Sequence, residues 1–587
     1  MTTSPSTVPM KILRKISENN LLPILSLGVG VCAGLAAVLL ERLISLIQSG
    51  LLPLMTAPGG FAWGRFLLPG AGMLLTLLFV RFAVRDNIGH GVTKVLLALS
   101  RGDSRIRPHN MGSSLAASAM TIGFGGSVGA EAPIVYTGAA LGSNFGRVAG
   151  MSQHGISILV GCGAAGAVSG IFGAPLAGVL FTLEVLMFNL SMSSLMPLLL
   201  STVSAAVVSY LFDGGVAKFA CDLTPFRLSN IPFYIALGII CGLVSLYFMR
   251  TTLALEDRLA RMRSTWLRWL LCSLALGLLI FLFPPLFGEG YDTLRSLLRG
   301  GELPLPERLS SPWMVPLFFA FVLLFKVFAM TFTNAGGGVG GTFGPTLIVG
   351  GLTGFVLARS LNLLFAGTGT VIPEHNFVLV GMAGLMAGVM QAPMTAIFLI
   401  AEITGGYELL LPLILCSTVS FGTIRYREKY SIYSKRIAQS GDLMTHDNDH
   451  SALMLIRTAE LVRDKYPHIR AEMSLRELVA LLSGSTAAVY PVLDAEGRFV
   501  AQVEVEHIRK IMFRTELYDT LRVKDLMEKP AFTVSSDERM ESVMQKFSKC
   551  DSWRLPVLDA DGHYLGFVSK SRVLEAYREV LREISTD

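Results

Sequence analysis

The sequence predicts an all-α polytopic membrane domain of two inverted repeats with broken helices, followed by a cytoplasmic α/β domain. Three observations support this prediction. Of the 587 residues, 52% are hydrophobic and only 16% are charged, whereas soluble globular domains carry about 25% charged residues. The apolar part of the chain repeats itself in ordered blocks. Near residue 423 the composition changes sharply, and the rest of the chain has the composition of a soluble domain.

The first apolar run marks the start of the membrane domain. Residues 21–40, "LLPILSLGVGVCAGLAAVLL", contain no charge and match the length of a helix that crosses a bilayer core of about 30 Å. A short basic segment precedes this run, and basic flanks tend to remain in the cytoplasm. We therefore expect a cytoplasmic N-terminal segment over residues 1–20 and a transmembrane domain over residues 21–440.

Two blocks of the membrane domain recur in the same order. In the first block the matching residues are Gly163, Gly166, Gly170, Ala174, Pro175 and Glu184, which correspond to Gly381, Gly384, Gly388, Ala392, Pro393 and Glu402. In the second, "GAEAPIVYTG" from Gly129 aligns with "GTFGPTLIVG" from Gly341. Ordered duplication indicates transporter-type repeats with the substrate site between them, here about 21–212 and 232–440. The alternative is that glycine-rich apolar sequence is generally self-similar.

The tail repeats as well. "PVLDAEGRFVAQVEVEHIRKIM" from Pro491 matches "PVLDADGHYLGFVSKSRVLEAY" from Pro556. Each copy predicts a strand, an Asp/Gly turn, a second strand and a helix. We therefore expect two small α/β modules, at about 441–515 and 524–587, packed as a pair.

The motifs "GAEAP" and "GTFGP" predict helix N-termini inside the membrane. Proline suits the first turn of a helix because it has no N–H to lose, and irregular backbone in lipid is tolerated where it is buried in protein or lines a cavity. Such helix starts carry a partial positive charge, and glycine lets a small ion approach their amides closely. Both motifs therefore predict an anion site. The alternative is that the glycines serve close helix packing.

Glu131 is one of three charged residues in the stretch 111–200 and lies among glycines, in "GGSVGAEAPIVYTGAALG". A buried carboxylate is costly unless it is hydrogen-bonded or neutralised, so we expect its proton to be exchangeable. The alternative is a structural carboxylate that caps backbone amides.

These motifs resemble those of the CLC family of chloride channels and proton-coupled anion exchangers, in the bacterial type with a C-terminal pair of CBS modules. The resemblance covers nearly the whole chain. The three anion motifs of the family are similar to "GHGVT" from Gly89, "GAEAP" from Gly129 and "GTFGP" from Gly341, and "SIYSKR" supplies the tyrosine of the central site. The implied anion-binding residues are Gly89, His90, Gly91, Gly129, Ala130, Glu131, Ala132, Thr342, Phe343, Gly344 and Tyr433.

The resemblance further implies that Glu131 is the gating glutamate, which occupies an anion site when ionised and swings away when protonated. It implies a homodimer in the cell (inner) membrane, with one pathway for chloride or a similar small anion in each subunit and with the N-terminus and CBS tail in the cytoplasm. Proton-coupled exchange is the favoured mechanism, and a passive voltage- or pH-gated chloride channel is the alternative. The preference between chloride and fluoride stays open.

Two departures from the family pattern concern the proton. His90 stands where serine is usual; it either donates to the anion or takes up a proton, or it is satisfied by backbone groups. Val185 stands where exchangers often carry an internal glutamate. Because valine cannot relay a proton, three alternatives stay open for the proton route: water threading the apolar region, His90 as a relay, or no route at all. The preceding Glu184 recurs as Glu402, which favours a structural role for both.

Other classes of protein lack support in the sequence. No H-E-x-x-H pair is present, so an intramembrane metalloprotease is excluded, and we expect no enzyme activity and no metal site. A cation transporter with CBS modules would need several intramembrane carboxylates or polar ligands, whereas this chain offers glycine-lined helix starts. The net charge of +6 is modest and spread along the chain, so it does not indicate nucleic-acid binding. His507 and Arg572 occupy the ribose-binding aspartate positions of CBS pairs, so we expect weak nucleotide binding at those positions or none, and no cofactor.

Overall fold

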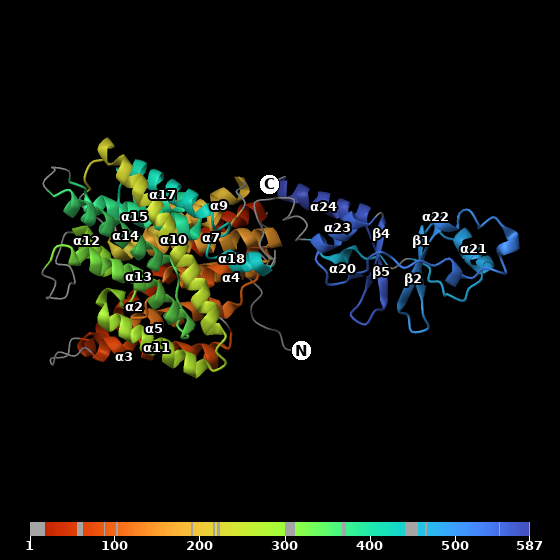
Figure 1. Ribbon diagram of the computed structural model, residues 1–587, viewed down its shortest axis with the longest axis horizontal. Coiled ribbons are helices and arrows are strands. Elements are labelled where there is room, and N and C mark those ends of the chain that lie inside the picture. The colour runs from red at the N-terminus through yellow and green to blue at the C-terminus, as the bar shows by residue number, and fades with distance from the viewer. Residues whose placement is uncertain are drawn as a thin grey trace. The chain divides into compact units, whose positions relative to one another are not determined.

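The computed structural model describes residues 18–55, 63–86, 88–100, 104–188, 192–214, 218–219, 223–299, 311–366, 371–440, 456–463, 466–550 and 552–585. The predicted N-terminal segment 1–20 lies outside these residues except for its last three. The chain divides into two compact units, Met1–Leu443 and Met444–Asp587, of which the first is helical (Figure 1) and the second contains all the strands of the described residues.

The helices of the first unit follow the expected pattern of long spans mixed with short segments. Among the described residues, eight helices are long and apolar enough to cross a membrane. In chain order the helices are α2 (Glu18–Met55), α3 (Trp63–Leu78), α4 (Gly91–Ser100), α5 (Ser113–Gly123), α6 (Glu131–Ala149), α7 (Gln153–Phe172), α8 (Pro175–Glu184), α9 (Met192–Asp213), α10 (Ile231–Ala260), α11 (Thr265–Leu282), α12 (Tyr291–Arg299), α13 (Met314–Ala335), α14 (Phe343–Leu364), α15 (Glu374–Met390), α16 (Pro393–Thr404), α17 (Leu410–Arg425) and α18 (Lys435–Ser440).

The sequence repeat is a repeat of helix packing. In the first half α7 packs against α2, α6 and α9, and in the second half α15 packs against α10, α14 and α17. The duplicated prolines, Pro175 and Pro393, are the first residues of α8 and α16. The two halves therefore use the same arrangement of neighbours around a buried central helix.

Glycine brings these helices together in both halves. A Cβ atom on Gly163 of α7 would lie 1.9 Å from the carbonyl oxygen of Gly138 on α6, and one on Gly381 of α15 would lie 2.4 Å from the carbonyl oxygen of Gly350 on α14. Close backbone contact is a common way to associate helices in a membrane. These repeated glycines thus serve packing, whereas the glycines of the anion motifs lie at helix starts.

Two helices begin in the interior of the first unit. The chain leaves α5 at Gly123 and enters α6 at Glu131, and it leaves α13 at Ala335 and enters α14 at Phe343. The intervening segments pair through their backbones, because the Gly129 amide donates to the Gly341 carbonyl at 3.0 Å and the Gly341 amide donates back at 2.7 Å. The N-termini of α6 and α14 therefore meet at one buried point.

The second unit contains two small sheets. In the first sheet β1 (Val489–Leu493) pairs antiparallel with β2 (Phe499–Glu504). In the second, β4 (Arg554–Leu558) pairs antiparallel with β5 (Tyr564–Ser569) and parallel with β3 (Val534–Ser535). The helices are α20 (Thr458–Leu461), α21 (Leu475–Ser483), α22 (Val505–Ile508), α23 (Met540–Lys549) and α24 (Lys570–Ser585). The predicted order of strand, turn, strand and helix is confirmed in both copies, although α22 is a single turn and α24 is long.

The two cores of this unit do not follow chain order. Ile456 and Leu461, which precede the first sheet, are buried with Val534 and Val557 of the second sheet. Val523, which lies after the first sheet, is buried in the core of that sheet. Each small sheet is thus covered by residues from both sides of it in the chain.

Candidate anion-binding site

The three predicted anion motifs converge in the structure. Gly91, the first residue of α4, lies so close to α6 that a Cβ atom there would be 2.6 Å from the carbonyl oxygen of Ala132. Ala132 in turn lies beside Gly341, where an added Cβ would be 2.7 Å from the Ala132 Cβ. Residues that lie far apart in the sequence therefore form one site, with the starts of α4, α6 and α14 around it.

Glu131 is the first residue of α6 and is 1% exposed. Its Oε2 accepts a hydrogen bond from the Gly344 amide at 3.2 Å, and its Oε1 accepts one from the Tyr291 hydroxyl. The carboxylate of one repeat thus binds the N-terminus of a helix in the other repeat, where the helix dipole favours negative charge.

Tyr433 and Phe343 both lie at the α14 N-terminus, of which Phe343 is the first residue. The Thr342 hydroxyl donates to the Tyr433 hydroxyl oxygen at 3.1 Å, which leaves the Tyr433 O–H free to donate to a further acceptor. Tyr433 is 6% exposed and Phe343 is 1% exposed. The Phe343 ring packs against the Phe172 ring, with 5.3 Å between their centroids. This arrangement provides a hydroxyl donor and an aromatic wall beside the helix end.

His90 lies at the edge of the site with a charged neighbour. Its Nε2 is 3.8 Å from Oε1 of Glu256 on α10, and the other Glu256 oxygen is 2.7 Å from Nη2 of Arg436 on α18. The His90 side chain is 40% exposed, and its backbone has a φ of 54°. The imidazole therefore faces an ion pair that links α10 to α18, the helix that follows Tyr433.

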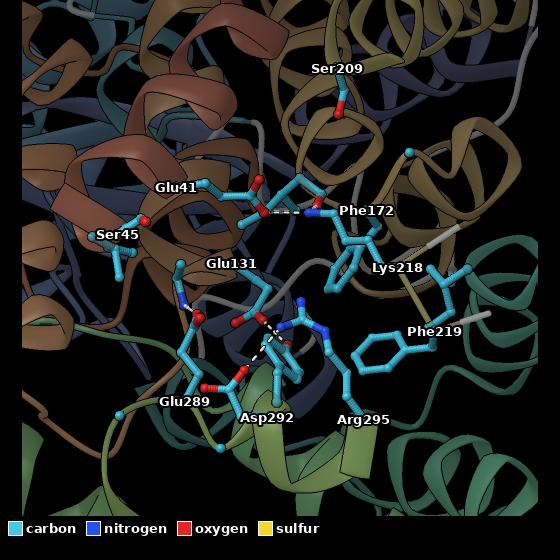
Figure 2. A pocket seen from close by; sticks show the side chains of 18 of the residues that line it. Glu41, Ser45, Glu131, Phe172, Ser209, Lys218, Phe219, Glu289, Asp292 and Arg295 are labelled. Atoms are coloured by element: carbon cyan, nitrogen blue, oxygen red, sulfur yellow. Dashed lines mark hydrogen bonds and ion pairs between the residues drawn. The ribbon is translucent and has the colours of Figure 1, made fainter. Parts of the chain in front are cut away.

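A cavity of about 1470 Å³ opens on the Glu131 side of the site. Charged side chains of both signs line it, and Figure 2 shows Glu41, Lys218, Glu289 and Arg295 around Glu131. The Lys218 ammonium pairs with the Glu41 carboxylate and donates to the Ile171 carbonyl. The cavity therefore brings charged groups of both signs to the Glu131 side of the site.

Three residues of this site were not predicted from the sequence. Glu289 and Tyr291 belong to "FGEGYD", in which Glu289 precedes α12 and Tyr291 is its first residue. The Glu289 Oε1 accepts a hydrogen bond from the Ala130 amide at 3.0 Å. Lys326 on α13 is fully buried, and its Nζ lies 2.8 Å from the Ser127 Oγ. A signal was present for two of them: Glu289 lies between glycines, as Glu131 lies among them, and Lys326 is the only charged residue of α13.

The repeated glutamates cap helices reciprocally. The Glu184 carboxylate accepts hydrogen bonds from the second and third amides of α16 at 3.0 and 2.7 Å. The Glu402 carboxylate accepts from the second and third amides of α8 at 3.0 and 2.9 Å. The residues before these helices, Ala174 and Ala392, have no side-chain acceptor of their own. Each glutamate therefore satisfies amides that a helix start leaves unpaired.

The two tail residues at the ribose-binding positions differ in their surroundings. His507 Nδ1 lies 3.2 Å from Oε1 of Glu528. The Arg572 backbone amide donates to the Ser569 hydroxyl at 3.4 Å, whereas Nη1 of its side chain is buried without a hydrogen-bond partner among the described residues. The expectation that these positions bind nucleotide weakly or not at all stays a prediction.

Comparison with known proteins agrees with this geometry. The family model described as voltage gated chloride channel matches residues 71–425, and the CBS domain model matches residues 523–579. A putative chloride channel protein ClcB-like of Ralstonia nicotianae is 29% identical over 386 residues, which cover 65% of this chain and 87% of that protein. The chloride channel protein CLC-e of Arabidopsis thaliana is 29% identical over 422 residues, which cover 66% of this chain and 57% of that protein.

Two solved structures have a similar fold. A slow cyanobacterial Cl⁻/H⁺ antiporter has a TM-score of 0.61 at 22% identity and covers 71% of this chain and 97% of its own. A eukaryotic CLC transporter has a TM-score of 0.62 at 18% identity and covers 96% of this chain and 99% of its own.

Fold and family together define a multi-pass membrane protein of the anion-transport class. The chain belongs to the voltage gated chloride channel, or CLC, family, because the family model matches more than half of its residues. It also carries a C-terminal CBS domain.

Proposed function

We propose that this protein moves chloride or a similar small anion through a pathway gated by Glu131, in exchange for protons. The observation that carries the proposal is the hydrogen bond from the Gly344 amide to the Glu131 carboxylate at 3.2 Å. A carboxylate in this position stands in for a transported anion, because both are attracted by the same partial positive charge at a helix start. The Cl⁻/H⁺ and fluoride/proton antiporters among the solved structures of similar fold support the coupling to protons.

The gate follows from competition for one set of amides. Ionised Glu131 holds the Gly344 amide and excludes an anion. When Glu131 takes up a proton from the cavity, its attraction to the helix start weakens, and an anion can replace it. Backbone amides supply only partial charges, so the anion is not trapped where it binds to them. The buried Lys326 ammonium is bonded to the Ser127 hydroxyl and the Gly288 carbonyl instead.

The remaining predicted residues line the same pathway in this proposal. The turns Gly89–Gly91 and Gly129–Ala132 present backbone to the anion, and Thr342–Gly344 does so from the other repeat. Beyond Glu131, the Tyr433 hydroxyl donates to the anion and Phe343 forms an apolar wall. The contact of Thr342 with Tyr433 at 3.1 Å supports this role, since it leaves the tyrosine proton for the anion.

Proton-coupled exchange needs a proton path from Glu131 to the inside. Val185, at the position of the internal glutamate of many exchangers, cannot relay a proton, so another group has to do so. We propose His90 as the relay, since its ring lies 3.8 Å from the Glu256 carboxylate and is accessible at 40%. A histidine changes charge near neutral pH and is suited to pass a proton on. The alternative function is a passive channel, in which Glu131 gates anion flow without proton transport.

A substitution of Glu131 tests the proposal. In vesicles with an imposed chloride gradient, the parent protein should move protons against the chloride flow. Glu131→Gln should retain chloride flux and lose proton transport, because a neutral amide carries no proton. Asp292→Asn, at an exposed carboxylate of the same cavity, is the control and should behave as the parent. Proton transport by Glu131→Gln equal to that of the parent would contradict the role of Glu131.

The assembly and location are also proposed. We expect a homodimer with one pathway in each subunit, in the cell (inner) membrane, and the basic residues before the first span support a cytoplasmic N-terminus. The CBS tail would then also lie in the cytoplasm, and the protein would need no cofactor.

A further inference from the structure

Each of the two interior helix starts is held by a carboxylate from elsewhere in the chain. At α14 the Gly344 amide donates to Glu131. At α6 the Ala130 amide, in the second anion motif, donates to Glu289 Oε1 at 3.0 Å. Glu289 and Glu131 both line the cavity, as Figure 2 shows. An anion that arrives through the cavity therefore meets two carboxylates on the amides that it needs.

The loop that carries Glu289 is fixed to the site on both sides. The Gly288 amide donates to the Gly125 carbonyl at 3.1 Å, and the buried Lys326 donates to the Gly288 carbonyl at 3.0 Å. Two residues after Glu289, the Tyr291 hydroxyl donates to Glu131. The loop from Gly288 to Tyr291, which Lys326 holds in place, thus links the carboxylates of Glu289 and Glu131.

The hydrogen bonding of Glu289 differs from that of the structural caps. Glu184 and Glu402 each bind two consecutive amides of a helix start. Glu289 binds one amide at 3.0 Å and lies at the wall of the cavity. A single hydrogen bond can be exchanged for a bond to an incoming anion.

Burial and the neighbouring charges raise the pKa of Glu289 to about 8, within reach of physiological pH. Burial is the largest cause, and the neighbouring Glu131 raises the pKa further, as does Glu41 on α2. The hydrogen bond from Ala130 and the Lys218 ammonium act in the opposite direction. The buried Lys326 ammonium on α13 and the Tyr291 phenol on α12 also face this carboxylate.

We propose that Glu289 is a second gating carboxylate, which occupies the Ala130 amide when ionised and releases it when protonated. This inference rests on the proposed anion transport through the same site. An anion from the cavity then has to displace Glu289 from α6 as well as Glu131 from α14. Protonation opens the two positions separately, and the entrance is fully open when both carboxylates are neutral.

The test uses the full-length protein with Glu131 already neutralised. In Glu131→Gln, chloride flux should still fall as the pH on the cavity side rises, with a limiting slope of about tenfold per pH unit for one titrating group. The double variant Glu131→Gln/Glu289→Gln should lose this dependence and keep its high flux at alkaline pH. Glu131→Gln/Asp292→Asn is the matched control and should keep the full dependence.

Each result separates the second gate from the first. If chloride flux through Glu131→Gln is already independent of pH, or if the dependence survives in the double variant, Glu289 is not a gate. If the parent protein carries no chloride, the proposed function fails, and the inference fails with it. Glu131→Gln/Glu289→Asp retains a titrating carboxyl and guards against misfolding: it should keep a pH dependence, and a flat response would overturn the inference.

Discussion

At the scale of single residues, the roles of Glu131 and Glu289 depend on partners that lie far away in the sequence. Glu131 stands out in the sequence as a charge among glycines. Its binding to Gly344, by contrast, follows only from the pairing of two interior segments. Glu289 and Lys326 carry comparable local signals, but their partners Ala130 and Ser127 belong to another repeat. Local sequence can indicate an unusual charge, whereas its partner is determined by the fold.

The Tyr433 hydroxyl gives a prediction at this scale. Tyr433→Phe removes one donor and leaves the ring, so the affinity for chloride measured by titration calorimetry should fall about ten- to a hundredfold, as expected for a hydrogen bond to a charged partner. Tyr247→Phe is the control, because that hydroxyl donates to the Leu324 carbonyl instead. Equal affinities for the parent and Tyr433→Phe would place the central anion elsewhere.

At the scale of elements, the repeat in the sequence predicted the repeated helices, because each glycine and proline of the pattern has a backbone role. Pro175 and Pro393 begin equivalent helices, and the paired glycines make equivalent close contacts. The reciprocal capping by Glu184 and Glu402 was not predictable, since it depends on how the two repeats face each other. The length of α22, 4 residues against 16 in α24, was not predictable from the repeat, because the two tail copies diverge in sequence there.

The caps give a prediction for helix stability. Glu402→Ala should leave two amides of α8 without an acceptor and should lower stability by about 1–2 kcal/mol, measured as a lower melting temperature in detergent. Glu184→Ala should cause a similar loss at α16. Glu408→Ala, at an exposed position in the next turn, is the control and should melt as the parent. A loss in only one of the two cap variants would contradict the reciprocal arrangement.

At the scale of the whole molecule, composition separates the membrane and tail regions but does not locate the border. The composition changes near residue 423, whereas the helical unit extends to Leu443. Residues 431–434 are polar in part and yet buried, because they carry Tyr433 into the site. In the tail, composition likewise did not predict that Ile456 and Leu461, which precede the first sheet, are buried against the second, or that Val523, which follows the first sheet, is buried in its core.

The reversal potential of the reconstituted protein tests the central claim, proton-coupled anion transport, most directly. A fixed chloride gradient is imposed, and the potential is recorded with and without a pH gradient. The account predicts a reversal potential that departs from the chloride equilibrium potential and moves when the pH gradient is changed, because protons and anions share one cycle. A value that stays at the chloride equilibrium potential whatever the pH gradient would contradict the account and identify a passive channel.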